Sequence, residues 1–233
     1  IEFEQTRIYC TQTSIADPKQ SLETGQRLTE QLPSADLAAV FILSDGTRVN
    51  GSDLVAGINQ RNAGKVPVTG GLAGDGSRFL QTRTGLNQVP EEGLVIAVGF
   101  YGKALRVGHG SRGGWDEFGP SRLITRSDKN ILYEIDGRNA LDLYKEYLGP
   151  FREELPASSL LFPLLIRQPG SAEGLVRTIL SLDEVAKTMT FAGNMPVNSG
   201  VRLMKANFDH LIRASSDAAV LSGEKQSGPP QLA

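Results

Sequence analysis

The stretch Leu37-Ala-Ala-Val-Phe-Ile-Leu43 is a continuous apolar run that stops at the turn residues Ser44-Asp45-Gly46. A run of this length predicts a buried β-strand. A helical pattern precedes it, capped at Asp17-Pro18, and a shorter helix begins after it at Gly51. With a further strand expected at 65–69, this alternation of strands and helices indicates a largely parallel sheet at the start of the chain.

Residues 77–135 lose the helical periodicity and show short β-type segments between Gly, Pro and Asn or Asp turns. After Asp136-Gly137 a helix follows, with apolar residues at Leu141, Tyr144 and Leu148. The remaining chain again favours strands. We expect strands at 78–83, 94–101, 104–108, 122–126, 131–135, 160–166, 176–182, 188–191 and 201–204.

These patterns predict an α/β to α+β protein with mixed β-sheets, flanking helices and two linked modules. We expect the first module at residues 1–135, the beginning of a second, truncated module at 136–222, and a disordered end at 223–233. The final helix begins at Asn207 and carries an apolar stripe that includes Phe208 and Ile212. His210 lies opposite this stripe, so we expect it to be solvated and not to bind a ligand.

The composition limits the class of protein. The chain has 233 residues and a net charge of −2, and its basic residues are scattered. This distribution argues against nucleic-acid binding. Cys10 is the only cysteine, which excludes an intrachain disulfide and a cysteine zinc site.

The longest apolar runs fall far below the ~18 residues that a membrane-spanning helix needs. The chain opens with Ile1-Glu2-Phe3-Glu4, without an initiator Met or the pattern of a signal peptide. We therefore expect an internal piece of a longer, cytoplasmic protein that does not contact a membrane.

The segment Gly70-Gly-Leu-Ala-Gly-Asp-Gly76 carries four glycines in seven residues directly after an expected strand. Backbone without Cβ atoms lets a ligand approach closely, and successive N–H groups can bind an anion. The spacing matches neither a P-loop nor the dinucleotide fingerprint. Alternatively, the segment is a tight turn that lets two strands pack. The candidate ligand-binding residues here are Gly70, Gly71, Gly74 and Asp75, with Asp75 as an acceptor for an amino group.

A second glycine-rich segment, 108–120, holds one of the two histidines and the only tryptophan. Trp115 and Phe118 offer flat apolar surface to a ligand. The guanidinium of Arg112 can bind a carboxylate, and the imidazole of His109 can bind a metal ion. Alternatively, Trp115 fills the core beneath the loop and His109 bonds a backbone carbonyl. We include His109, Arg112 and Trp115 among the candidate ligand-binding residues.

No motif supports classical catalysis, because neither His109 nor His210 lies in a nucleophile elbow. We therefore expect a binding module and not an enzyme. The competing enzyme hypothesis is a hydrolase that uses clustered carboxylates and a bound water. It would be favoured if Asp45, Asp75 and Asp136 met in one cleft with raised pKa values.

Five motifs follow one another along the chain. They are Phe41-Ile-Leu-Ser-Asp-Gly46, Asn50-Gly51, Val66-Pro-Val-Thr-Gly-Gly-Leu-Ala-Gly-Asp75, Leu132-Tyr-Glu-Ile-Asp-Gly137 and Ala140-Leu-Asp-Leu-Tyr-Lys-Glu-Tyr-Leu-Gly149. In this order and spacing they resemble the FIST sensory domains. The first two thirds look like the N-terminal module of that family, and the rest looks like the start of its C-terminal module. The opening segment of the former and the Cys- and Glu-containing end of the latter have no counterpart here.

The resemblance implies a bacterial or archaeal intracellular input domain that binds a small ligand such as an amino acid. It also implies an output partner, a histidine kinase or a diguanylate cyclase. One subgroup resembles haem proteins that sense nitric oxide, and residues 108–115 are similar to that subgroup. If haem binds, we expect His109 to be the axial metal ligand, because Cys10 lies in an opening strand and His210 on the solvent side of its helix.

A third class of function is a protein–protein docking platform. An extensive exposed apolar patch without a deep pocket would favour it. We also expect an unpaired sheet edge around 201–204, and such an edge would drive the chain to form a homo-oligomer.

Overall fold

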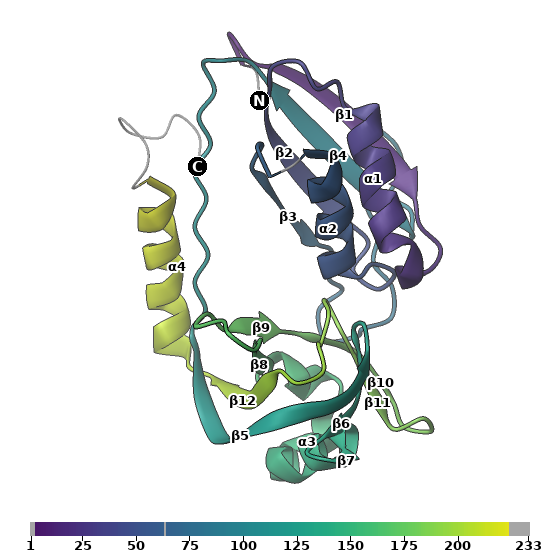
Figure 1. The fold of residues 1–233 in the computed structure, drawn as a ribbon, viewed down its shortest axis with the longest axis vertical. Helices are drawn as coiled ribbons and strands as arrows, with labels where there is room; N and C mark the ends of the chain where they lie inside the picture. The colour runs from purple at the N-terminus through teal and green to yellow at the C-terminus, as the bar shows by residue number, and fades with distance from the viewer. Residues whose placement is uncertain (1–2, 63, 224–233) are drawn as a thin grey trace.

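The computed structural model describes residues 3–62 and 64–223 and divides its strands between two sheets (Figure 1). The first sheet has the strand order β1-β4-β2-β3. These strands are β1 (Arg7–Ser14), β2 (Leu37–Ser44), β3 (Val68–Leu72) and β4 (Leu94–Tyr101). Only β2 and β3 run parallel, whereas β4 is antiparallel to both β1 and β2. The sheet is therefore mixed and not largely parallel, because the chain between β3 and β4 forms no crossover helix.

The helices α1 (Ser21–Gln31) and α2 (Gly51–Asn62) cover one face of the first sheet (Figure 1). A single 3-10 turn, η1 (Pro18–Gln20), leads into α1, and its cap Asp17 accepts a hydrogen bond from Lys19 N at 2.8 Å, as the sequence predicts. The core between the helices and the sheet contains Leu28, Leu32, Leu54 and Ile58 from the helices and Val40, Ile42, Val95 and Ala97 from the strands.

The second sheet has eight strands, seven of them in the order β10-β11-β6-β5-β12-β8-β9, with β7 paired to β6. Its strands are β5 (Trp115–Asp128), β6 (Ile131–Ile135), β7 (Arg138–Asn139), β8 (Leu164–Arg167), β9 (Leu175–Arg177), β10 (Ile179–Asp183), β11 (Thr188–Phe191) and β12 (Gly200–Ala206). The expected helix is α3 (Ala140–Leu148), which buries Leu141 and Tyr144 in the second core. Two 3-10 turns follow it, η2 (Gly149–Glu154) and η3 (Ala157–Leu160), and α4 (Phe208–Gly223) is the last helix.

Residues 102–114, here called the connecting segment, link the two sheets (Figure 1). β5 and β6 lie in the second sheet, although they precede the module boundary expected at residue 135. The strands expected at 78–83 and 104–108 do not form, because neither segment pairs with a sheet. Gly223 ends α4, and the rest of the expected disordered end lies outside the described residues. Within those residues, no helix is both long and apolar enough to cross a membrane.

β12 lies inside the second sheet, paired with β5 on one side and with β8 on the other. The unpaired edge expected around 201–204 is therefore wrong, because the long strand β5 returns along β12. β3 is an edge strand of the first sheet, and this edge faces the connecting segment (Figure 1).

Two glycines allow the connecting segment to lie directly against α4. A Cβ atom on Gly110 would lie 2.0 Å from the carbonyl oxygen of Ala218, and one on Gly114 would lie 2.2 Å from the backbone nitrogen of Leu211. No residue with a side chain fits at either contact. The backbone of the segment and the backbone of the helix are therefore in contact.

The face of α4 that packs differs from the stripe that the sequence indicates. Ala214 is the buried residue of the helix, and Leu211 is partly buried. Phe208 and Ile212 are 70% and 72% exposed. Leu211, which belongs to the predicted stripe, thus packs against the connecting segment, whereas Phe208 and Ile212 of the same stripe face outward.

Asp45 fixes the loops at the carboxyl end of β2. It is fully buried, and burial alone would raise its pKa. Hydrogen bonds from Gly93, Thr82 and Thr47 outweigh burial, and the pKa of Asp45 is lowered. Its carboxylate accepts from Thr47 N, Thr47 Oγ1, Arg48 N, Thr82 Oγ1 and Gly93 N, at distances between 2.7 and 3.1 Å.

We expect Asp45→Asn to lower the free energy of unfolding at neutral pH by about 2–4 kcal/mol, because an amide N–H then faces other donors. The folded pKa lies below the ordinary 3.8, so the carboxylate stabilises the fold above that pH. This contribution is lost as the pH falls through the folded pKa. Urea unfolding from neutral to strongly acidic pH checks both points. A difference between wild type and variant that stays constant over this range would contradict the assignment.

Candidate functional site

The first glycine-rich segment lies at the open edge of the first sheet. Gly70 and Gly71 are exposed residues of β3. Gly70 has a φ of +151°, and a Cβ on it would lie 2.0 Å from the carbonyl oxygen of Ile42. Gly71 and Gly74 instead have open space at that position and no left-handed backbone. Gly70 therefore lets β3 pack closely against β2, as the tight-turn alternative expects. Gly71 and Gly74 have open space beside them, so a ligand could approach their backbone.

Asp75 holds the loop after β3 in shape. Its carboxylate accepts hydrogen bonds from the backbone N–H groups of Leu80 at 2.8 Å, Phe79 at 3.0 Å and Gln81 at 3.2 Å. The bond from Leu80 is the largest cause of the lowered pKa of Asp75. Both carboxylate oxygens of Asp75 therefore already accept hydrogen bonds from the loop. Few lone pairs remain for the hydrogen bond from a ligand amino group that the sequence predicts.

The three aspartates of the hydrolase hypothesis occupy separate places. Asp136 lies in the turn between β6 and β7, where it accepts from Leu123 N at 2.8 Å and pairs with Arg122 at 2.9 Å. The hydrogen bond from Leu123 lowers the pKa of Asp136, and the pKa values of Asp45 and Asp75 are also lowered. The structure therefore shows neither the common cleft nor the raised pKa values that would favour this hypothesis.

The second glycine-rich segment forms one wall of a groove against α4, with a volume of about 250 Å³. The structure brings Arg112 and Trp115 to this groove, together with residues that the sequence analysis did not select. The lining residues are Arg112, Gly113, Gly114 and Trp115 on one side and His210, Arg213, Ala214 and Asp217 from α4 on the other.

The groove offers polar groups that the protein leaves unused. Within residues 3–62 and 64–223, Arg213 and Asp217 form no ion pair, and Arg112 bonds only the carbonyl of its neighbour Ser111 at 3.3 Å. The indole Nε1 of Trp115 is buried and has no acceptor in the same part of the chain. Two guanidinium groups and one carboxylate thus line one groove without an ion pair among the described residues, beside a partly buried indole.

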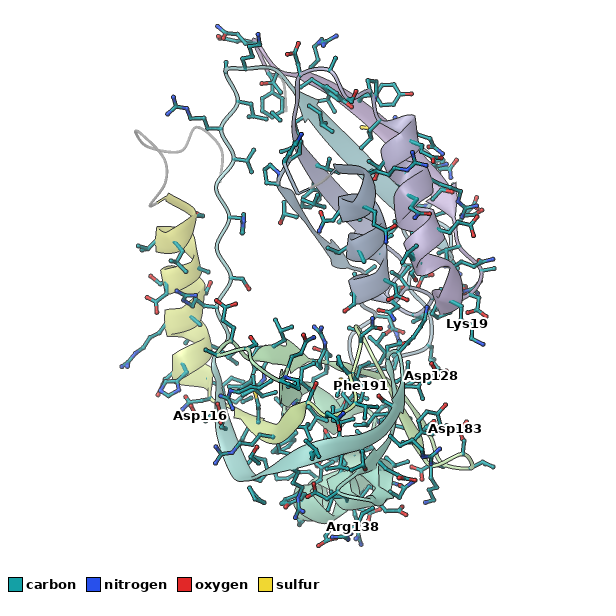
Figure 2. All side chains as sticks on the ribbon, in the orientation of Figure 1. Lys19, Asp116, Asp128, Arg138, Asp183 and Phe191 are labelled. Carbon is teal, nitrogen blue, oxygen red and sulfur yellow. The ribbon has the colours of Figure 1, made fainter. Side chains whose placement is uncertain are left out.

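His210 is exposed, as expected, but it also fixes the beginning of α4 to β5. Its Nδ1 lies 2.8 Å from Oδ1 of Asp116, and Asn207 Nδ2 donates to Oδ2 of the same carboxylate at 2.8 Å. The bond from Asn207, followed by that with His210, lowers the pKa of Asp116. Figure 2 marks Asp116 below the first turn of α4. Asp116 and His210 are 94 residues apart in sequence, so no local pattern could have paired them.

His109 does not line the groove. It lies exposed in the connecting segment and forms no hydrogen bond within the described residues, so the alternative of a bond to a backbone carbonyl isn't seen there either. Phe118 points into the second core, where its ring centroid lies 6.4 Å from that of Phe162. The described residues therefore do not gather Arg112, Trp115 and Phe118 around His109 as haem binding would require. Among them, no group of three or more His, Cys, Asp or Glu side chains is placed to hold a metal ion.

A larger hollow of about 510 Å³ lies beside α3. Its lining is entirely charged, and every one of these side chains already forms an ion pair. It lacks the apolar lining typical of a ligand site. The lining residues are Asp142, Lys145, Glu146, Arg152 and Glu153.

A group of polar side chains, here called the junction cluster, joins the two sheets where α2 begins. Phe191, labelled in Figure 2, is the last residue of β11. Asn194 follows three residues later, in the turn that contacts the first module. The cluster consists of Asn50, Ser52 and Asp53 from the first module and Lys129, Arg177 and Asn194 from strands and turns of the second sheet.

Asn194 is the centre of the junction cluster. Its Nδ2 donates to Asp53 at 2.8 Å, and its Oδ1 accepts from Asn50 Nδ2 at 2.6 Å. Asp53 is buried and also pairs with Lys129 at 2.7 Å. Burial lowers the pKa of Arg177, whose guanidinium donates to Ser52 Oγ at 3.3 Å. The Asn50-Gly51 motif signals the start of a helix, but nothing in it indicates these partners.

Two family models match the chain. The FIST N domain matches residues 1–138, and the FIST C domain matches residues 140–228. The first match extends through the connecting segment to β5 and β6. No curated protein and no solved structure gave a significant match. The chain belongs to the FIST family, whose members are sensory domains of signal transduction.

We expect Asn194→Ala to destabilise the contact between the modules, because it leaves Asn50 and the buried Asp53 each without one partner. The cost should be about 1–3 kcal/mol. In calorimetry, the variant should unfold at a lower temperature or in two separate transitions. The exposed Asn59→Ala, in α2, is the matched control. Unfolding identical to that of the control would show that the cluster does not hold the modules together.

We expect Gly70→Val to disrupt β3, because its Cβ would collide with the backbone of Ile42. Gly74→Val should leave the fold intact, because its Cβ meets open space and its backbone isn't left-handed. Thermal melts of the two variants check this difference. Equal losses of stability in both would contradict it.

Proposed function

We propose that this chain is a sensory module that binds a small zwitterionic ligand of the amino-acid type in the groove between the connecting segment and α4. One observation carries the proposal. The groove is lined by Arg112, Arg213 and Asp217, which form no ion pair among the described residues, next to an indole whose N–H has no acceptor there.

The lining chemistry suits such a ligand. A guanidinium group binds a carboxylate with two parallel hydrogen bonds, and Arg112 and Arg213 both supply one. Asp217 supplies the charge that an ammonium group needs, while Trp115 offers apolar surface and a hydrogen-bond donor. The volume of about 250 Å³ lies just below the range of drug-sized pockets and suits a smaller molecule.

Ligand binding in this groove would act on α4. The helix is held by backbone contact with Gly110 and Gly114 and by the Asp116–His210 pair, and it buries only Ala214. A ligand that bridges Arg112 and Arg213 would add a further link. We propose that this change is passed to a histidine kinase or a diguanylate cyclase in the cytoplasm of a bacterium, as in other sensory systems of this kind.

A haem site that senses nitric oxide is the alternative, and it rests on the free imidazole of His109 alone. The second alternative is a hydrolase, for which Asp45, Asp75 and Asp136 would have to meet in one cleft, and these three lie apart. We propose that the protein acts by binding and not by catalysis.

Thermal-shift measurements with a panel of amino acids and with haem test the proposal. At least one amino acid should stabilise the wild type, by about 2.7 kcal/mol at a concentration 100 times its dissociation constant. Arg112→Ala should remove this stabilisation, whereas Arg83→Ala, an exposed arginine of the first module, should keep it. Gly74→Val should also keep it. Loss in Gly74→Val with retention in Arg112→Ala would move the site to β3 and contradict the proposal.

Haem provides the second comparison in the same experiment. If haem stabilises the chain, its Soret absorption is measured with His109→Ala and with His210→Ala. A change of the ferric Soret band that is lost only in His109→Ala would establish the haem alternative in place of the amino-acid site. Stabilisation by no compound of the panel would overturn both.

A further inference from the structure

The first sheet is covered by helices on one face only (Figure 1). Val40 and Ile42 of β2 point to α1 and α2, so Phe41 and Leu43 point to the opposite face. The register of the strands places further apolar side chains beside them. This face is here called the open sheet face, and the polar residues Gln12 and Thr69 lie on it. Its apolar residues are Ile8, Cys10, Ala39, Phe41, Leu43, Ile96, Val98 and Phe100.

Part of the open sheet face is accessible apolar surface, although Ala39 and Ile96 are buried. Ile8, Phe41 and Leu43 are 44%, 36% and 43% exposed, and no helix of the described residues packs on them. A sheet with apolar residues on both faces is normally buried between two layers. Contiguous exposed apolar surface of this kind marks a site of association.

α4 has the complementary surface. Successive residues of an α-helix are rotated by about 100°, so Phe208, Ile212 and Ala219 lie within about 40° of one another. Phe208 and Ile212 are 70% and 72% exposed. These residues form the outer stripe of α4. The opposite side, with Ala214, packs against the connecting segment.

We propose that two copies of this chain form a dimer in which the outer stripe of each α4 packs on the open sheet face of the other copy. The lengths match, because 16 helical residues span about 24 Å and the eight-residue strands β2 and β4 span about 26 Å. Each sheet thereby gains the second helix layer that it lacks, and each α4 buries its outer stripe.

The helix that covers the open sheet face comes from a second copy because of the course of the chain. The connecting segment lies between α4 and the first module (Figure 1). Gly110 and Gly114 hold the inner side of α4 against this segment, so the outer stripe faces away from its own first sheet. An unrelated helix on the sheet would leave the outer stripe exposed, whereas two reciprocal contacts bury both surfaces and close the assembly.

Sedimentation velocity over a wide range of protein concentration tests the dimer. The wild type should show a monomer–dimer equilibrium. Ile212→Glu on the helix and Leu43→Glu on the sheet should each raise the dissociation constant roughly 100-fold, because each change damages both contacts of the dimer. Val185→Glu, in the exposed turn between β10 and β11, is the control and should leave the equilibrium unchanged. Circular dichroism verifies that the variants fold, which their exposed positions favour.

A mixture of the two variants separates this arrangement from others. Ile212→Glu retains an intact sheet face and Leu43→Glu retains an intact helix, so the mixed pair keeps one undamaged contact. The mixture should therefore associate more tightly than either variant alone. A wild type that is monomeric at all concentrations overturns the proposal. So does a dimer weakened by Leu43→Glu but not by Ile212→Glu, which would indicate sheet-to-sheet packing, or a mixture that associates no better than its components. None of these outcomes depends on a ligand in the groove.

Discussion

The contact of Asp53 with Lys129 and Asn194 determines how the two sheets lie relative to each other. Asp53 sits in the first turn of α2, where a negative charge is favoured by the helix dipole, and it is buried at the point where the second sheet arrives. A buried carboxylate needs partners, and both come from turns of the second sheet, at 2.7 and 2.8 Å. The position of the connecting segment, and with it that of α4, depends on the geometry that these bonds impose.

Local features of the fold were predictable from the sequence, and long-range ones were not. The cap at Asp17, the strand β2 and the helix α3 follow from residues that are close neighbours along the chain. The membership of β5 in the second sheet depends on its pairing with β12, more than 70 positions later. Periodicity says nothing about such a partner, so the expected edge at 201–204 was wrong.

The candidate groove shows the same division. Arg112 and Trp115 were selected because a short glycine-rich segment holds them together. Arg213 and Asp217 lie about 100 residues later on α4 and carry no motif, so only the fold brings them to the same groove. The orientation of α4 was missed for a related reason. Its apolar stripe is real, but contact between backbones at Gly110 and Gly114 decides which side faces inward.

The two modules are joined in two ways and at opposite ends. The connecting segment leaves the first sheet at the far end of β4, whereas the junction cluster closes the other end (Figure 1). If the hydrogen bonds of the cluster open, 13 extended residues still limit the separation of the segment's ends to about 43–47 Å. Such a short tether keeps the two halves of the cluster at a millimolar effective concentration. Opening is then a reversible, unimolecular event, and its equilibrium does not change when the protein is diluted.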